Sequence, residues 1–279
     1  MKTLVRTVAS GLLLSLSALN AQAETAYLLA GNHLLHRFVT DTPGAFDASI
    51  PLSGLGAGET AIGMDARPLT RQLYVLTQDA ANAGRIYTLN SDTGAATLVA
   101  TLAADPADLT DPYTALGGTS FGVDFNPVPD RLRVESNALQ NLRVNPATGL
   151  VTTDNALNPG TPQIVGSGYT NSYAGAPSTT LYTLDANADV LAIQNPPNNG
   201  TLVMVGALGF DFSQLAGFDI AGGSGVQTAY AALTVGGLSG FYRIDLTTGG
   251  ATLFGQLPGS PPIIDMAVSL DIVFYNGFE

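Results

Sequence analysis

Short apolar runs separated by turn residues recur along most of the chain. One unit contains the runs 62–68, 73–77, 85–90 and 93–99, which are rich in β-branched, aliphatic and aromatic residues. Segments rich in Gly, Pro, Asn and Asp separate them. Such runs predict β-strands, and apolar residues at successive positions predict strands that are buried on both faces. Since no long segment after residue 23 has a helical period, the pattern predicts an all-β protein.

The four-strand unit repeats along the chain. Further units open near residues 121, 173 and 217, and a lone opening strand follows at 264–270. The opening positions recur at intervals of about 45 to 60 residues, which is typical of propeller blades. The equivalent points in the five opening strands are Asp65, Asp124, Ala174, Asp219 and Asp265.

The two ends of the chain supply the parts of one further blade. Strand-like runs at 26–29, 34–38 and 50–52 lack an opening strand, and the run at 264–270 lacks later strands. We expect these segments to share one sheet, because closing the ring would leave fewer unpaired sheet edges. The prediction is a β-propeller of five four-stranded blades, closed by a C-terminal strand that joins the N-terminal blade. A two-sheet sandwich is the alternative, since strand counts alone do not distinguish the two folds.

Residues 1–23 have the composition of a secretory signal peptide. Lys2 and Arg6 precede an apolar stretch, and Ala21-Gln22-Ala23 forms a small-residue cleavage site. The apolar stretch is too short to span a bilayer, and no later segment approaches the roughly 20 apolar residues that a membrane helix needs. We therefore expect an exported protein, periplasmic or extracellular and without a membrane span, whose propeller covers residues 24–271. Residues 272–279 then form a short tail.

The charge balance argues against a nucleic-acid partner. The chain has 10 Lys and Arg residues against 22 Asp and Glu residues, and its formal net charge is −12. An acidic surface repels phosphate groups. The chain also has no cysteine and two histidines, which excludes disulfides, thiolate catalysis and cysteine-based zinc sites. We predict no cofactor and expect a monomer that binds an unknown extracellular ligand or protein.

Four of the five opening strands carry an aspartate at the same point, namely Asp65, Asp124, Asp219 and Asp265. Opening strands in propellers line the central channel, so these carboxylates should lie close together there. They could hold a hard cation such as Ca²⁺, which takes oxygen ligands. Alternatively, each aspartate could accept hydrogen bonds from backbone amides in a loop of the neighbouring blade, and so serve the repeat itself.

The densest polar cluster lies at residues 124–135 and continues at 140–143. On a strand, Arg131 and Arg133 share one face and could present two guanidinium groups to a carboxylate, a sulfate or a sugar acid. Alternatively, they could pair with Asp124, Asp130 or Glu135 across a blade interface. The candidate binding residues are Asp124, Asn126, Asp130, Arg131, Arg133, Asn141 and Arg143.

The same segments resemble a bacterial family known as domain of unknown function 4394. The most specific pieces are D-F-N-P-x-x-D-R-L-R-V at residues 124–134 and Q-N-L-R-V-N-P at 140–146. The likeness covers nearly all of the chain after residue 23, although Ala66 stands where an aromatic residue is expected. The resemblance implies an exported protein built from repeats, and it supplies no catalytic residue.

Two functions are compatible with these patterns. We expect a binding or interaction module, because a rigid ring presents its loops as one surface. The alternative is a hydrolase or lyase that uses carboxylates, with or without a bound cation, on an extracellular substrate such as a glycan. No pair of carboxylates stands out from its spacing, so the sequence predicts no catalytic residue.

Overall fold

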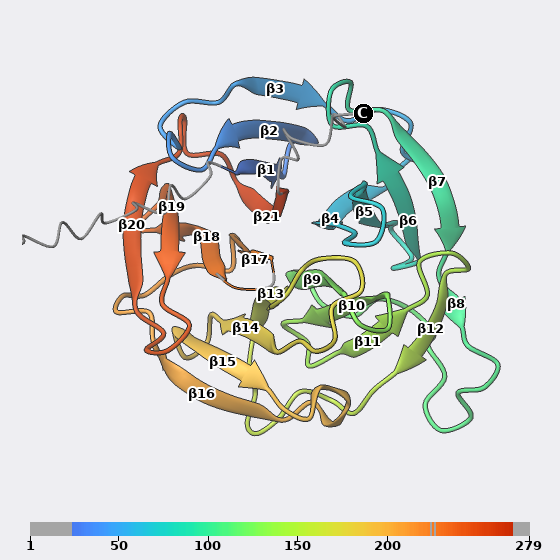
Figure 1. Cartoon of the computed structure of the whole chain (residues 1–279). Helices are drawn as coiled ribbons and strands as arrows, with labels where there is room; N and C mark the ends of the chain where they lie inside the picture. Colours follow the sequence, from blue (N-terminus) through green and yellow to red (C-terminus); the bar gives the residue numbers. More distant parts are fainter. Residues whose placement is uncertain (1–23, 224, 226, 270–279) are drawn as a thin grey trace, which may run out of the picture.

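The computed structural model describes residues 24–269 apart from 224 and 226. Five sheets surround a central channel, and the strands of each sheet follow one another in order from the centre to the rim (Figure 1). The predicted five-bladed β-propeller is confirmed, and the two-sheet alternative is wrong. The one helix of the described residues is a 3₁₀ turn at Pro197–Asn199, so none there has the length to cross a bilayer. The predicted signal peptide and tail lie outside the described residues.

Each blade is built on four antiparallel strands that follow one another from the centre outward. Blade 1 contains β21 (Ile263–Ser269), β1 (Thr25–Ala30), β2 (Leu34–Val39) and β3 (Ala48–Pro51). Blade 2 contains β4 (Thr60–Ala66), β5 (Leu73–Gln78), β6 (Gly84–Leu89) and β7 (Ala96–Thr101). Blade 3 contains β9 (Phe121–Asn126), β10 (Arg131–Ser136), β11 (Asn141–Val144) and β12 (Leu150–Thr153). Blade 4 contains β13 (Ile164–Tyr169), β14 (Leu181–Asp185), β15 (Val190–Gln194) and β16 (Leu202–Ala207). Blade 5 contains β17 (Ala216–Ala221), β18 (Thr228–Val235), β19 (Leu238–Ile244) and β20 (Ala251–Gln256).

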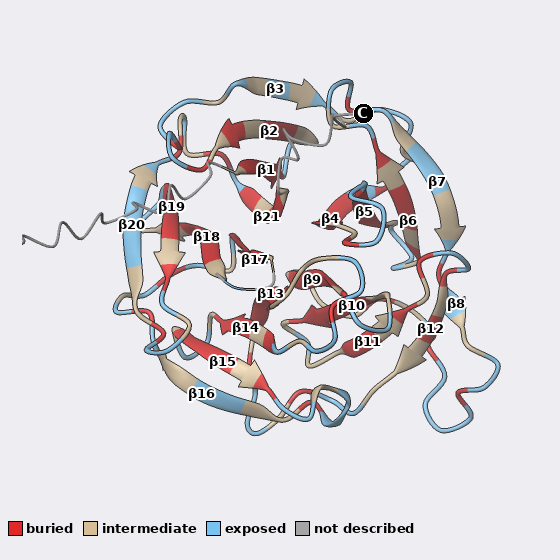
Figure 2. Cartoon of the chain, viewed as in Figure 1, coloured by how far each residue is buried: buried red, intermediate tan, exposed pale blue. Residues whose placement is uncertain are grey.

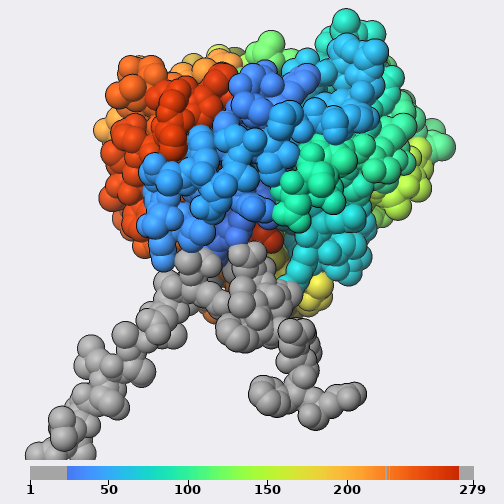
Figure 3. Space-filling view, turned by 90° about the horizontal axis from the view of Figure 1, so that it is seen from above, coloured from blue at the N-terminus to red at the C-terminus, as the bar shows by residue number. Residues whose placement is uncertain are grey.

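Blade 1 closes the ring with strands from both ends of the chain. β21 pairs antiparallel with β1, so that Tyr27 lies opposite Ala267 and Leu29 lies opposite Asp265. In the space-filling view the blue N-terminal segments lie between the orange-red blade 5 and the cyan blade 2 (Figure 3). The predicted closure is therefore confirmed.

Hydrophobic side chains fill four of the five interfaces between blades. Leu29 packs with Met64 between blades 1 and 2, and a second cluster around Phe125 joins blades 2 and 3. Further clusters join blades 4 and 5 and blades 5 and 1. Within the described residues, none of these clusters spans blades 3 and 4. The inner strands are buried on both faces, whereas the outer strands face solvent (Figure 2).

The opening strand of blade 4 lies earlier in the chain than the repeat predicts. β13 ends at Tyr169, and Gly168 rather than Ala174 is the counterpart of the opening aspartates, because it lies opposite Tyr182 as Asp65 lies opposite Tyr74. Glycines at 166 and 168 weaken the apolar signal of this strand. Gly166 is required by close packing, because a Cβ atom there would lie 2.7 Å from the Cβ atom of Phe218 in blade 5.

Blade 3 has a fifth strand that the repeat does not predict. The two-residue strand β8 (Ala103–Ala104) lies between blades 2 and 3 in the chain and pairs in parallel with β12. It covers part of the outer edge of blade 3, so the linker from the preceding blade protects this edge from pairing with another chain.

Candidate functional site at the interface of blades 3 and 4

The channel aspartates lie on the innermost strands of blades 1, 2, 3 and 5 and are buried. Asp65, Asp124 and Asp219 place one carboxylate oxygen each within 4.8 Å of the others. The structure therefore brings together three of the four predicted channel carboxylates, and Asp265 lies outside this group.

Each channel aspartate accepts a hydrogen bond from a backbone amide of the next blade around the ring. The donors lie in the innermost strands, not in loops as the sequence pattern suggests. The interface of blades 4 and 5 lacks this bond, because Gly168 occupies the position of the aspartate. The bonds run from Met64 N to Asp265 Oδ2 (2.9 Å), from Phe125 N to Asp65 Oδ2 (2.7 Å), from Tyr169 N to Asp124 Oδ1 (3.3 Å) and from Val268 N to Asp219 Oδ2 (2.6 Å).

Burial raises the pKa of all four channel carboxyl groups. For Asp219, loss of solvation outweighs the amides of Val268 and Ile220 and raises the pKa to about 6. The pKa values of Asp65, Asp124 and Asp265 are raised well above the ordinary range, chiefly by burial and also by the neighbouring carboxylates. The channel is consequently less negative than four ionised carboxylates would make it.

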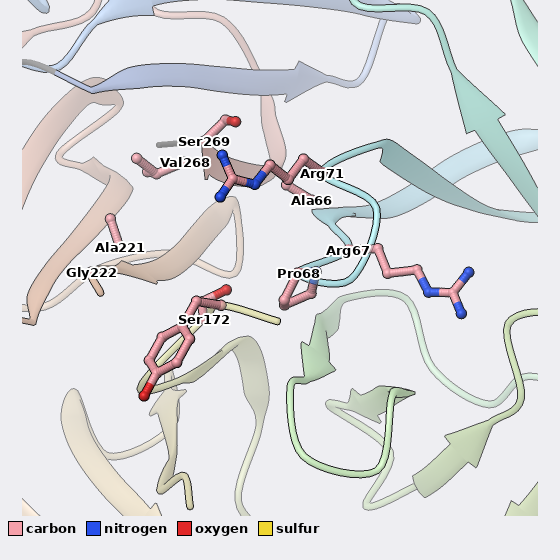
Figure 4. A pocket seen from close by; sticks show the side chains of 10 residues that line it. Ala66, Arg67, Pro68, Arg71, Ser172, Ala221, Gly222, Val268 and Ser269 are labelled. Atoms are coloured by element: carbon pink, nitrogen blue, oxygen red, sulfur yellow. The ribbon is translucent and has the colours of Figure 1, made fainter. Parts of the chain in front are cut away.

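One end of the channel opens at a small pocket of about 40 Å³ (Figure 4). Arg71 extends over this mouth, whereas Arg67 points away from it (Figure 4). Arg67 instead binds Asp130 of blade 3, with 2.8 Å between Nε and Oδ1, and donates to the hydroxyl of Tyr74. The candidate residue Asp130 therefore belongs to a pair that joins blades 2 and 3.

The interface of blades 3 and 4 is built from buried polar side chains. Blade 3 contributes Arg133, Glu135 and Asn141, which are at most 2% exposed. Blade 4 contributes Ser167, Thr183 and Gln194, which are at most 1% exposed. Polar groups are costly to bury unless they are paired, so this interface depends on its hydrogen bonds.

Arg133 is held by protein groups on all sides. Its Nη1 atom donates to Asn141 Oδ1 and to Asp154 Oδ2, both at 2.7 Å. Nη2 donates to Asn198 Oδ1 at 2.9 Å, and Nε donates to the hydroxyl of Tyr169 at 3.2 Å. Arg133 therefore acts as an interface clamp, but its acidic hydrogen-bond partner is Asp154 and not Asp124, Asp130 or Glu135.

The three arginines of the polar cluster do not converge on one open position. Arg143 binds the same Asp154 carboxylate through Nε at 2.7 Å and Nη2 at 2.9 Å. Arg131 is partly exposed and donates to the backbone carbonyls of Pro129 and Asp130. Arg131 and Arg133 therefore do not form a joint binding site for a carboxylate or sulfate ligand.

Three buried side-chain oxygen atoms of this interface have no hydrogen-bond partner within the described part of the chain. They are Glu135 Oε1, Thr183 Oγ1 and Gln194 Oε1. Glu135 Oε2 accepts from Ser167 at 2.7 Å, and burial raises the pKa of Glu135 while Arg133 opposes that shift. The Gln194 oxygen calls for a hydrogen-bond donor, and the Thr183 hydroxyl can donate as well as accept.

A pocket of about 200 Å³ adjoins the polar interface. Asn126, at the end of β9, lines it from blade 3, and Tyr169, Thr180 and Gln194 line it from blade 4. Gln194 thus belongs both to the pocket wall and to the set of unpaired buried groups. The candidate residues Asp124 and Asn141 lie behind this wall and contact it through Tyr169 and Gln194.

Sequence reasoning missed Asp154, Tyr169, Gln194 and Asn198. Asp154 and Asn198 lie in connections, where no repeat marks them. Gln194 had a usable signal, because it follows Val190 and Ala192 on one face of a strand that is otherwise apolar.

The family comparison agrees with the repeat structure. A family model described as Domain of unknown function (DUF4394) matches residues 34–267. The chain belongs to this family. The match includes β9, β10 and β11, and therefore the whole blade 3 side of the polar interface of this DUF4394 domain. No curated protein matches the chain.

Solved structures resemble the DUF4394 domain in fold at low sequence identity. A chain of a nidogen/laminin complex is 12% identical with a TM-score of 0.52, and the likeness covers 88% of this chain and 98% of that one. A putative 6-phosphogluconolactonase from Bacteroides fragilis is 14% identical with a TM-score of 0.41, over 90% of this chain and 99% of that one. At 12% identity, the likeness to the nidogen/laminin chain shows the fold alone.

Replacing Arg133 should strongly destabilise the DUF4394 domain. In Arg133→Met the buried carboxylate of Asp154 keeps Arg143 but loses its more deeply buried partner, so we expect a loss of about 3–5 kcal/mol in the free energy of unfolding. Urea unfolding measures this loss. Arg131→Met is the matched control and should change the free energy by no more than about 0.5 kcal/mol. Equal effects of the two variants would contradict the clamp.

Asp219 should make stability fall as pH rises. Its pKa is raised to about 6 in the folded protein, above the unfolded value of about 3.9, so its contribution to stability is full below pH ~4 and is lost as pH rises through 6. Between pH 4.5 and 7.5 the free energy of unfolding of the Asp219→Asn variant should therefore fall by about 2 kcal/mol less than that of the wild type.

Urea unfolding at the two pH values tests this difference. The exposed Asp211 provides the control, and Asp211→Asn should follow the wild type. If the free energy of unfolding fell equally with pH in Asp219→Asn and the wild type, burial would not raise the pKa of the Asp219 carboxyl group.

Proposed function

We propose that the protein is an exported binding module that holds a small polar ligand in the pocket between blades 3 and 4. One observation carries this proposal. Among the described interfaces, this one alone lacks a hydrophobic cluster, and it leaves the pocket residue Gln194 with an unpaired oxygen. Apolar residues would join two blades at no cost in stability, since buried ion pairs are often replaceable by hydrophobic side chains. A ligand gives the polar interface a purpose that the fold alone does not.

The position of the pocket also supports the proposal. Small-molecule sites are concave, with a few polar groups that converge on the ligand. The family-specific segment 124–134 supplies the blade 3 side, including Asn126 at the pocket wall and Arg133 behind it. The signal-like residues 1–23 support export to the periplasm or the cell exterior, where we propose that the protein acts as a monomer.

Blocking the pocket should abolish ligand binding without unfolding the protein. Thr180 lines the pocket and is exposed, so the indole of Thr180→Trp can fill the pocket from its solvent side. A thermal-melt screen of glycans and small acids identifies ligands, and titration calorimetry measures their affinities. We expect Thr180→Trp to weaken binding at least about tenfold.

Thr252→Trp is the matched control, because Thr252 is exposed on β20 of blade 5, away from the pocket. This variant should bind as the wild type does. Ligands that bind Thr180→Trp and wild type equally would place the site elsewhere, and a screen without any ligand would count against a small-molecule module.

A cation-dependent hydrolase or lyase is the second candidate, and the grouping of Asp65, Asp124 and Asp219 favours it. However, both oxygens of Asp65 and of Asp219 and one oxygen of Asp124 already accept backbone amides. Ca²⁺ requires six to eight oxygen ligands. The arrangement of these carboxylates therefore suits acceptors of backbone amide hydrogen bonds better than it suits a calcium site.

Calcium distinguishes the two candidates. We expect millimolar Ca²⁺ to leave the melting temperature of chelator-treated protein unchanged, because the channel oxygens already have donors. Elemental analysis of the purified protein is the companion measurement. Bound calcium, together with a rise in melting temperature that Asp124→Asn removes, would favour the second candidate instead.

A further inference from the structure

The chemistry of its neighbours identifies the unpaired atom of Gln194. Arg133 only donates hydrogen bonds, so the atom of Asn141 that faces it at 2.7 Å must be Oδ1. Gln194 Nε2 donates to that Oδ1 at 3.4 Å and to the carbonyl of Pro197 at 2.7 Å. Turning the amide of Gln194 would place an oxygen against two acceptors. The free atom is therefore Oε1, an acceptor that requires a donor.

An acidic ligand does not supply this donor. Ionised carboxylates, like sulfates, offer acceptors only and would face Gln194 Oε1 without a hydrogen between them. The cation behind the wall is also already neutralised, since Arg133 and Arg143 share Asp154 and Glu135 lies beside Arg133. Both guanidinium groups are therefore already engaged by a protein carboxylate and are not free to bind an anion.

The pocket walls combine neutral polar groups with apolar ones. Asn126, Thr180 and Asn195 provide amides and a hydroxyl, and Leu181 and Pro197 provide apolar surface. None of the residues that line the pocket carries a formal charge at neutral pH. The volume of about 200 Å³ is several times the share of one water molecule, which is about 30 Å³.

From these features we infer that the ligand is a neutral sugar or a similar cyclic polyol, and that a small shift of the Gln194 side chain, which is buried, lets a hydroxyl group of the ligand donate to Oε1. Hydroxyl groups both donate and accept, so they match the mixed amide and hydroxyl lining. The C–H faces of a sugar ring match Leu181 and Pro197. This inference rests on the proposed binding function and specifies its ligand class.

Paired sugars that differ in charge test the inference. Glucose and galactose are titrated calorimetrically against the purified protein and compared with glucuronate and galacturonate. We expect each neutral sugar to bind at least about tenfold more tightly than its acid. Gln194→Met, which keeps the side-chain length but removes Oε1, should weaken neutral-sugar binding about tenfold or more.

Thr180→Trp is used alongside Gln194→Met, because a buried substitution can reduce folding. Neutral sugars that bind the wild type and are excluded by Thr180→Trp support the inference even if Gln194→Met does not fold. Tighter binding of the acids, or binding only of ligands other than sugars, overturns the inference. If Thr180→Trp still blocks those ligands, the binding function stands; if it blocks nothing, both proposals fail.

Discussion

The innermost strands of neighbouring blades lie so close together that a carboxylate of one strand accepts a hydrogen bond from the backbone of the next. This spacing explains the Gly-x-Asp pattern in three of the opening strands. A Cβ atom at Gly63 would lie 2.2 Å from a side-chain atom of Val123, and one at Gly217 would lie 2.5 Å from the amide of Met266. Glycine lets the two innermost strands lie this close, and the aspartate two residues later accepts a hydrogen bond from the backbone of the neighbouring strand. The repeated aspartates are thus part of the ring's construction.

The same closeness makes the channel chemically unusual. Carboxyl groups held away from solvent keep their protons to higher pH, so the centre of an acidic protein carries less charge than its composition suggests. Backbone amides of the neighbouring blades donate hydrogen bonds to these carboxyl groups. The channel is therefore best understood as a structural element, while the proposed recognition chemistry lies farther out, between blades 3 and 4.

The sequence predicted the fold well and the site only partly. Four of the five opening strands, the closure between the ends of the chain and the grouping of Asp65, Asp124 and Asp219 all followed from periodic patterns. Blade 4 was misplaced because two glycines hid its first strand, and β8 was missed because it forms two residues of a linker. Periodicity identifies residues that are repeated from blade to blade, and it says little about residues that have a role in a single blade.

The polar interface shows this limit most clearly. The segment 124–143 was recognised as unusual, and Arg133 and Asn141 do lie in the interface. Their partners Asp154 and Asn198 come from connections whose position depends on the closed ring, so no local pattern could assign them. The pairing interpretation of Arg133 assumed an acid in its own segment, whereas the carboxylate that it binds is supplied by the connection after β12.

Among the described residues no hydrophobic cluster joins blades 3 and 4, and this also affects how the ring responds to strain. Parting two blades elsewhere exposes apolar side chains to water, and the hydrophobic effect opposes that exposure. Parting blades 3 and 4 exposes groups that water can solvate, so the resistance comes mainly from hydrogen bonds that water can replace. Whether this interface holds therefore depends on the geometry of a few hydrogen bonds such as those of Arg133, whereas the other four interfaces depend on buried apolar area.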